Sequence, residues 1–251
     1  MTTEKPDTTH FGYREVPREE KASMVGDVFR SVANKYDLMN DVMSFGMHRL
    51  WKRFTLAKAN IKPGQQILDV ASGTGDLAIA MAKLVGKTGK VVMTDINESM
   101  LSVGRERVED AGMIGNIECL LADAEKLPFE NNHFDCVSIA FGLRNVTDKS
   151  VALKSMYKTL KPGGKVLILE FSHPVTPMLN KIYDFYSFNI IPGMGKLIAN
   201  DRESYQYLVE SIRMHPDQEK LKSMMIEAGF EDVEYFNLNG GIVALHMGYK
   251  Y

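Results

Sequence analysis

The chain has few cysteines, no long hydrophobic run and almost no net charge. Its 251 residues include two cysteines, Cys119 and Cys136, whose spacing fits neither a disulfide framework nor a zinc site. No run of about 18 apolar residues is present, so we expect no membrane-spanning helix. A formal net charge of −2 argues against the clustered basic surface that nucleic acid requires. These absences favour a cytoplasmic protein with free thiols, no metal and no nucleic-acid partner.

The N-terminal region also lacks the apolar centre of a secretory signal peptide. Residues 1–20 are charged and irregular, which predicts a flexible N-terminal arm. The rest of the chain contains no internal repeat and no low-complexity tract. A hydrophobic fraction of 45% and a charged fraction of 25% are sufficient for a sizeable core without disulfides. We therefore expect one domain over residues 21–251.

Hydrophobic periodicity divides this domain into a helical beginning and an alternating remainder. Between Lys21 and Asn60 apolar residues recur at helical spacing, with a break at residues 44–46, which predicts a helical cover over 21–60. Short apolar runs then alternate with amphipathic stretches, an order typical of a parallel sheet with helices on both faces. We expect strands at 66–70, 91–95, 117–121, 134–140 and 166–171, and helices at 76–85, 98–111 and 149–160.

The C-terminal part departs from this alternation. Two apolar runs, 233–238 and 241–249, are joined by Asn239-Gly240, a dipeptide that is a strong hairpin signal. A hairpin there places an antiparallel strand in or beside the parallel sheet. Residues 173–215 form an insertion before a last predicted helix at 218–228. The expected fold is a doubly wound, mostly parallel α/β sheet of seven strands, with a C-terminal antiparallel hairpin and an N-terminal helical cover.

The first predicted strand ends in a glycine turn flanked by carboxylates, Asp69-Val70-Ala71-Ser72-Gly73-Thr74-Gly75-Asp76. Glycines let the backbone approach a ligand closely, so Gly73, Thr74 and Gly75 are candidate binding residues. A nicotinamide site is the competing interpretation, but its third glycine is absent. Asp69 and Asp76 would repel a pyrophosphate, and no nearby lysine or arginine in the sequence offsets them. A cationic ligand without phosphate, such as S-adenosylmethionine, fits this turn better.

Acidic residues follow the next two strands as well. The second strand ends in Asp95, where a carboxylate accepts both ribose hydroxyls of an adenosine, in S-adenosylmethionine or in NAD. Asp123 and Ala124 follow the third strand, where an acid or amide meets the adenine edge. A lone aspartate often caps a turn or a helix instead, and this alternative stays open for each one. Acids at successive strand ends together favour an adenosine-binding crevice.

Three segments carry a closer resemblance. They are Tyr36-Asp37-Leu38-Met39-Asn40 with Ser44, His48 and Trp51; Phe141-Gly142-Leu143-Arg144-Asn145; and Lys161-Pro162-Gly163-Gly164 through Glu170-Phe171-Ser172. On these motifs the chain resembles, from His10 to Tyr251, the UbiE/COQ5 family of quinone-ring C-methyltransferases, a family of class I methyltransferases. Ala71 departs from the first glycine of the class pattern. Ala140 stands where family members can carry a binding serine, so we carry no contact over to it.

The resemblance implies a Rossmann-like methyltransferase sheet and an enzyme that uses S-adenosylmethionine as co-substrate and no metal. It implies a reduced polyprenyl quinone precursor as substrate, demethylmenaquinol or a polyprenyl methoxybenzoquinol, methylated at a ring carbon in respiratory quinone biosynthesis. Methyl transfer from a sulfonium needs in-line alignment with a nucleophile. A hydroquinol carbon becomes nucleophilic when a ring hydroxyl loses its proton. The site therefore needs a base or a positive group that stabilises the phenolate.

Arg144 and Asn145 follow the fourth strand, at the crevice edge where substrate should lie, and are candidate catalytic residues. The guanidinium can hold the phenolate oxygen or a water that removes its proton. The alternative is a structural pair with a helix or a neighbouring acid. Tyr36, from the helical cover, is a third catalytic candidate. His173 is a potential base near neutral pH, but a lone histidine beside a proline is better explained as a loop residue.

Residues 178–198 are unusually rich in apolar side chains. They form either a tunnel for the polyprenyl tail or the core of a cap or a dimer interface. No basic amphipathic helix is evident, so we expect only a weak, peripheral contact with the inner membrane. A homodimer and an association with other quinone-biosynthesis enzymes both stay open. The rival functions are methylation of another small phenol or lipid, ligand binding without catalysis, and a nicotinamide dehydrogenase.

Overall fold

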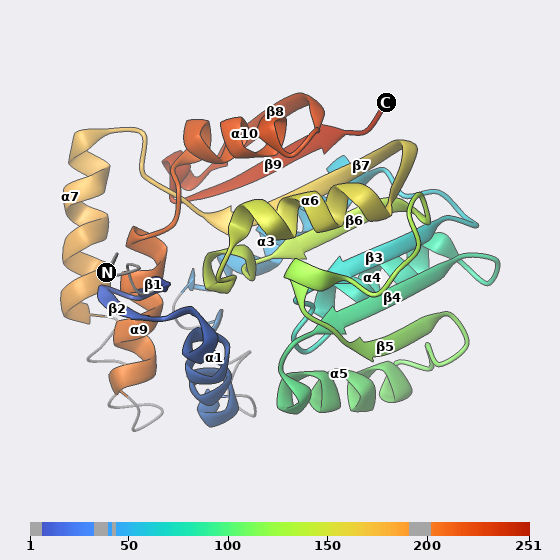
Figure 1. The fold of residues 1–251 in the computed structure, drawn as a ribbon, viewed down its shortest axis with the longest axis horizontal. Helices are drawn as coiled ribbons and strands as arrows, with labels where there is room; N and C mark the ends of the chain where they lie inside the picture. Colours follow the sequence, from blue (N-terminus) through green and yellow to red (C-terminus); the bar gives the residue numbers. More distant parts are fainter. Residues whose placement is uncertain (1–6, 33–39, 42–43, 191–201) are drawn as a thin grey trace, which may run out of the picture.

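A seven-stranded sheet with helices on both faces forms the centre of the molecule (Figure 1). The computed structural model describes residues 7–32, 40–41, 44–190 and 202–251. The strand order is β5-β4-β3-β6-β7-β9-β8, and β9 alone runs antiparallel to its neighbours. The strands are β3 (Gln66–Val70), β4 (Lys90–Asp95), β5 (Ile117–Leu121), β6 (Phe134–Ala140), β7 (Leu160–Phe171), β8 (Glu231–Leu238) and β9 (Val243–Tyr249). The predicted fold class, the seven strands and the C-terminal hairpin are confirmed.

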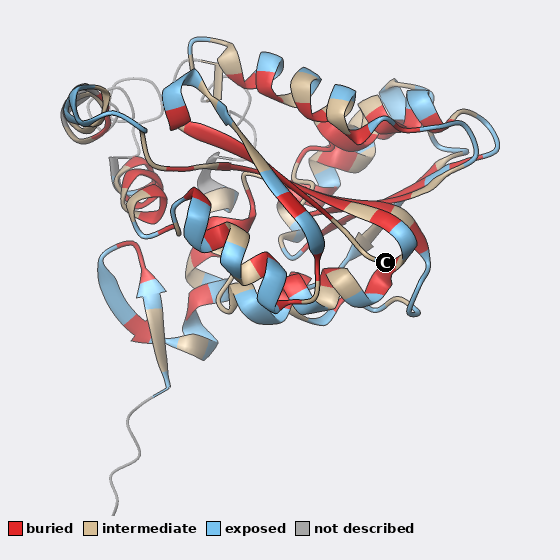
Figure 2. Ribbon diagram, turned by 90° about the horizontal axis from the view of Figure 1, so that it is seen from above, coloured by how far each residue is buried: buried red, intermediate tan, exposed pale blue. Residues whose placement is uncertain are grey.

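The strands are apolar on both faces because two helical layers enclose them. Successive residues alternate between the layers: Ile67 packs in one cluster with α3, α4 and α5, and Leu68 packs in the other with α6 and α10. Figure 2 shows the resulting pattern, with buried strands and helices whose outer sides are exposed. These helices are α3 (Met47–Ala59), α4 (Asp76–Val85), α5 (Glu98–Asp110), α6 (Lys149–Thr159) and α10 (Gln218–Glu227).

Local sequence signals account for most element boundaries. Asn97, Asp148 and Asp217 cap α5, α6 and α10 by accepting hydrogen bonds from backbone N–H groups of the first helical turn. The strands β3, β5 and β6 have the predicted bounds. The strand β7 begins earlier than expected because Leu160 pairs with Phe134 across a register shift, which also ends α6 one residue sooner.

The expectation of an irregular arm over residues 1–20 is wrong for residues 8–20. There the chain forms a hairpin of β1 (Thr8–Phe11) and β2 (Arg14–Pro17), and α1 (Arg18–Val32) begins. Phe11 is buried and stacks on Tyr207, with 4.1 Å between the ring centroids. That partner lies almost two hundred positions later in the chain, so local sequence does not reveal the packing that orders the hairpin.

The insertion and the N-terminal elements gather beyond the carboxyl ends of the parallel strands (Figure 1). The insertion contains α7 (Pro177–Phe185), a π-helical turn η4 (Tyr186–Ile190) and α9 (Arg202–Arg213). Part of the apolar stretch at 178–198 lies outside the described residues. Among the residues that the structure describes, no helix is both long and apolar enough to cross a bilayer.

Candidate active site

A cavity of about 160 Å³ lies where the parallel strands end, beneath α1 and α9. Its walls contain most of the predicted binding and catalytic residues, drawn from the ends of β3, β4, β5 and β6 and the loops that follow them: Asp69, Gly73, Thr74, Asp95, Asp123, Ala124, Arg144 and Asn145. Tyr36 lies outside the described residues. Gly75 supports the turn without lining the cavity, and His173 does not line it either, because its Nε2 meets the backbone oxygen of His215 at 3.1 Å.

The glycine turn after β3 has a backbone conformation and close neighbours that disfavour side chains at its two glycines. Gly73 and Gly75 adopt φ values of 56° and 82°, in the left-handed region that favours glycine. A Cβ atom on Gly75 would lie 3.2 Å from the Cε atom of Met93. Ala71 also has a positive φ, 49°, so the alanine that replaces the class glycine keeps the same kind of turn.

Asp95 holds the glycine turn and faces the cavity. Its Oδ2 accepts a hydrogen bond from the backbone N–H of Gly73 at 2.8 Å, and its Oδ1 accepts one from Asn97 at 2.8 Å. Burial raises the pKa of Asp95, and these backbone donors oppose the shift. A carboxylate at the end of β4 therefore joins the glycine turn to the cavity wall.

Asp69 is almost completely buried at the end of β3 and borders the same cavity. Burial raises its pKa to about 7, although the Ser138 hydroxyl donates a hydrogen bond to Oδ1 at 2.6 Å and opposes the shift. A carboxyl poised near neutrality can become fully ionised when a cation binds beside it.

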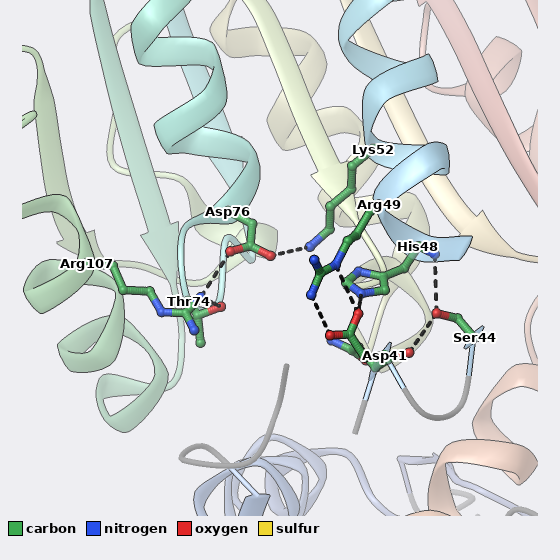
Figure 3. Close-up of polar contacts among 9 residues, drawn as sticks. Asp41, Ser44, His48, Arg49, Lys52, Thr74, Asp76 and Arg107 are labelled. Atoms are coloured by element: carbon green, nitrogen blue, oxygen red, sulfur yellow. Dashed lines mark hydrogen bonds and ion pairs between the residues drawn. The ribbon is translucent and has the colours of Figure 1, made fainter. Parts of the chain in front are cut away.

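Asp76 is paired with two cations, which corrects the view of the turn as an unbalanced acidic site (Figure 3). Lys52 of α3 lies 2.9 Å from Oδ2, and Arg107 of α5 lies 3.0 Å from Oδ1 and 3.1 Å from the Thr74 hydroxyl. Burial raises the pKa of Asp76, but these two cations together bring it below its ordinary value. The argument against a pyrophosphate from this carboxylate therefore fails, whereas Asp69 forms no ion pair with the residues that the structure describes.

One wall of the cavity, with a polar cluster behind it (Figure 3), is formed by Asn40, Ser44, His48, Trp51 and Lys52. Asp41 accepts hydrogen bonds from His48 Nε2 at 2.7 Å and Arg49 Nε at 3.0 Å. The hydrogen bonds from these two side chains lower the pKa of Asp41. Ser44 accepts the backbone N–H of His48 at 3.2 Å, which closes the turn into α3. The motif residues thus fix the start of α3 against the site.

Arg144 and Glu170 form a buried ion pair at the cavity. Arg144 Nη1 donates to Glu170 Oε1 at 2.9 Å and also to the backbone oxygen of Phe141. The backbone N–H groups of Arg144 and Phe171 donate to the same carboxylate, at 3.1 and 2.9 Å. Arg144 therefore has an acidic partner, as expected if its role is to form a structural ion pair. Its Nε is buried and has no hydrogen-bond partner in the described part of the chain.

Asn145 is oriented by a tyrosine that sequence reasoning missed. The Tyr207 hydroxyl of α9 donates to Asn145 Oδ1 at 3.0 Å, and both residues line the cavity. Because the amide oxygen is engaged, the amide nitrogen is the group available to donate. Lys52, Arg107 and Tyr207 contact site residues from distant segments, and no local signal marks them; Glu170 lies in a motif of the resemblance, but its pairing with Arg144 could not be predicted from it.

Asp123 caps a turn, which is the alternative role that the sequence left open, and it also lines the cavity. Its Oδ1 accepts the backbone N–H of Glu125 at 2.9 Å at the start of the turn η2 (Ala124–Lys126). Within the described ranges no group of three or more histidine, cysteine or acidic side chains is arranged to hold a metal ion.

Comparison with known proteins shows the family of the chain. A model of the ubiE/COQ5 methyltransferase family matches residues 15–250. The chain belongs to the ubiE/COQ5 methyltransferase family. It is 60% identical, over all 251 residues and the whole of each relative, to ubiquinone/menaquinone biosynthesis C-methyltransferase UbiE of Escherichia coli K12 and of Shigella boydii serotype 18. The chain is therefore an S-adenosylmethionine-dependent methyltransferase.

Solved structures of low sequence identity share the fold of this family member. A possible histamine N-methyltransferase from Thermotoga maritima has a TM-score of 0.63 at 19% identity, covering 90% of this chain and 99% of its own. A SAM-dependent methyltransferase from Aquifex aeolicus has a TM-score of 0.58 at 19% identity, covering 80% of this chain and 89% of its own. The Rossmann-like methyltransferase sheet expected from the resemblance is confirmed.

Proposed function

We propose that the chain transfers the methyl group of S-adenosylmethionine to a ring carbon of a reduced polyprenyl quinone precursor. Demethylmenaquinol and a polyprenyl methoxybenzoquinol are the two substrates. The observation that carries this proposal is 60% identity over the full length to curated ubiquinone/menaquinone C-methyltransferases. The cavity supports it, because each of the three segments that carry the resemblance contributes residues to its wall, among them Trp51, Arg144 and Phe171.

The cavity has groups that fit the parts of S-adenosylmethionine, which supplies the methyl group. Asp95 stands at the end of β4, where its carboxylate would accept the ribose hydroxyls. Asp123 and Ala124 lie in the wall where the adenine would bind. The backbone of Gly73 and Thr74 would lie against the amino-acid part, and Asp69 would stabilise the positive charge of the ligand.

The substrate ring would lie between Arg144, Asn145 and the aromatic wall of Trp51, Phe141 and Phe171. The Arg144 guanidinium would stabilise the phenolate oxygen, or orient the water that takes its proton, and so raise the nucleophilicity of the ring carbon. The Asn145 amide nitrogen would donate to a second ring oxygen. Tyr36 remains a third catalytic candidate.

The expected location follows from the substrate. A polyprenyl tail partitions into a bilayer, so a cytoplasmic enzyme would meet it through weak, peripheral contact with the inner membrane. A homodimer and a complex with other quinone-biosynthesis enzymes stay as the two hypotheses for its assembly.

Loss of the protein should change the quinone profile of its cells. We expect ubiquinone and menaquinone to be replaced by precursors that lack one ring methyl group, as measured by mass spectrometry of lipid extracts. Reintroduction of the unaltered gene should restore both quinones. A normal profile in the deletion strain, with a different unmethylated phenol accumulating, would contradict the proposed substrate.

Cofactor affinity should depend on pH through Asp69. Its pKa of about 7 means that the free site is partly protonated at neutral pH, and a bound cation favours the ionised form. The association constant for S-adenosylmethionine should therefore reach its highest value above pH 7. Below pH 7 it should fall by up to about tenfold per pH unit. Calorimetry between about pH 5.5 and about pH 7.5, a range that includes the pKa of about 7, tests this. Asp69→Asn should bind more weakly and lose this dependence; an equal slope in both proteins would exclude Asp69 as its source.

A further inference from the structure

A second cavity adjoins the first and has no role in the methyl transfer described above. Its volume is about 240 Å³, and it lies among α3, α7, η4, α9 and the C-terminal hairpin. Its lining side chains are mainly apolar, including Met47, Leu179, Ile212 and Ile242. No charged side chain of the described residues lines it. A space of this kind accepts a neutral, hydrocarbon ligand and is a poor site for ordered water.

The two cavities share part of their walls. Ser44, Trp51, Phe171 and Leu208 line both of them. Trp51 and Phe171 meet edge to face with 6.2 Å between ring centroids, and Phe141 packs on Phe171 at 5.0 Å. A ligand ring on the Arg144 side of this aromatic junction would therefore have its substituent directed across Trp51 and Phe171.

The polar groups at this aromatic junction are hydrogen-bonded to each other within the protein. Trp51 Nε1 donates to Asn239 Oδ1 at 2.7 Å, so neither the indole N–H nor the amide oxygen needs a partner from the ligand. The indole and the two phenyl rings are left as apolar surfaces. Phe45 also lines the second cavity and is 79% exposed, so the cavity reaches the surface at this residue.

We propose that the second cavity binds the first isoprenoid units of the polyprenyl tail, with the remaining units leaving past Phe45. This inference rests on the proposed function, because it assigns the tail of the same substrate whose ring occupies the first cavity. The ring side of the junction has charged groups, whereas the described lining of the tail side is mainly apolar and carries no charged side chain, which matches the two halves of a polyprenyl hydroquinol. The junction thereby orients the ring, because only one end of the ligand suits each cavity.

The single tryptophan of the chain makes binding directly measurable. Trp51 lies at the junction, so farnesol, a prenyl alcohol of three isoprenoid units, should change its fluorescence in a saturable way. Ile212→Phe, which places a larger side chain at the cavity wall on α9, should weaken this binding by about tenfold or more. Leu179→Phe is a second variant at a half-buried position, for use if Ile212→Phe does not fold. Ile226→Phe, on the exposed side of α10, is the matched control.

Kinetics with two substrates separate the tail site from the reaction. The unaltered enzyme should prefer a hydroquinol with two isoprenoid units over the same ring with a hydrogen in their place. Ile212→Phe should raise KM for the prenylated substrate about tenfold, with the tail-less ring as internal reference. Equal losses for both substrates, or no farnesol response in the unaltered protein, would overturn the assignment of the cavity. Methylation of neither substrate, with farnesol still bound, would instead contradict the proposed function.

Discussion

Arg144→Ala should lower turnover by about 10²-fold or more while cofactor affinity stays within about twofold. The guanidinium would be the positive group closest to the developing phenolate, whereas the adenosine would bind at Asp95, on another part of the cavity wall. Arg144→Lys should restore little, because one ammonium cannot reproduce a planar set of donors. Turnover, cofactor affinity and melting temperature measured on the same preparations test this.

The buried partner of Arg144 requires a control. Removing the guanidinium leaves the Glu170 carboxylate buried without its cation, which should destabilise the protein by about 3–5 kcal/mol. Arg144→Ala combined with Glu170→Gln removes both charges and keeps an acceptor oxygen for one of the two backbone N–H groups, of Arg144 and Phe171, that donate to the carboxylate. If Arg144 is catalytic, the double variant regains stability and stays slow. Recovery of turnover together with stability would show that the arginine has only a structural role.

Asp95→Ala should weaken the binding of S-adenosylmethionine by about 2–4 kcal/mol, because two ribose hydroxyls lose a charged acceptor. The structure adds a second cause, since the same carboxylate holds the backbone of Gly73 in the glycine turn. Calorimetry gives the dissociation constant, and NADH in the same assay should not bind.

A matched variant separates the two causes of this loss. Asp95→Asn keeps one acceptor oxygen and the size of the side chain, so it should preserve more of the turn and of the affinity than Asp95→Ala. A dissociation constant within about twofold of the original in Asp95→Ala would remove Asp95 from the binding site. Tight NADH binding without S-adenosylmethionine binding would overturn the assignment of the cofactor.

The sheet and its strand ends were predictable because their signals are local. The central strands contain short apolar runs bounded by turn residues, and β3, β4, β5 and β6 are each followed by a loop that carries an acid or a glycine. Parallel strands bring their carboxyl ends to one edge, so Asp69, Asp95, Asp123 and Arg144 could be assigned to one crevice before any contact was known. The cavity that contains all four follows from topology alone.

The partners of these residues depend on the tertiary structure. Local sequence showed two carboxylates at the glycine turn, but Lys52 and Arg107 reach Asp76 from helices on either side of it. In the same way Glu170 reaches Arg144 from β7, and Tyr207 reaches Asn145 from α9. The net charge of a site depends on all charged groups that lie near it. Side chains far apart in sequence come near the site only when the chain folds.

The amino-acid sequence by itself determined the α/β class, the antiparallel hairpin and the family, and it predicted the sheet edge for adenosine binding, since these depend on periodicity, turn residues and motifs. Only the tertiary structure decided that residues 8–17 form a packed hairpin, that Asp76 is neutralised and that Arg144 has a buried acidic partner. It also decided that a second, apolar cavity continues from the first across Trp51. The physical reason is the same in each case. Periodicity and turns are properties of neighbouring residues, whereas burial, ion pairing and cavity shape are properties of surfaces that meet only after folding.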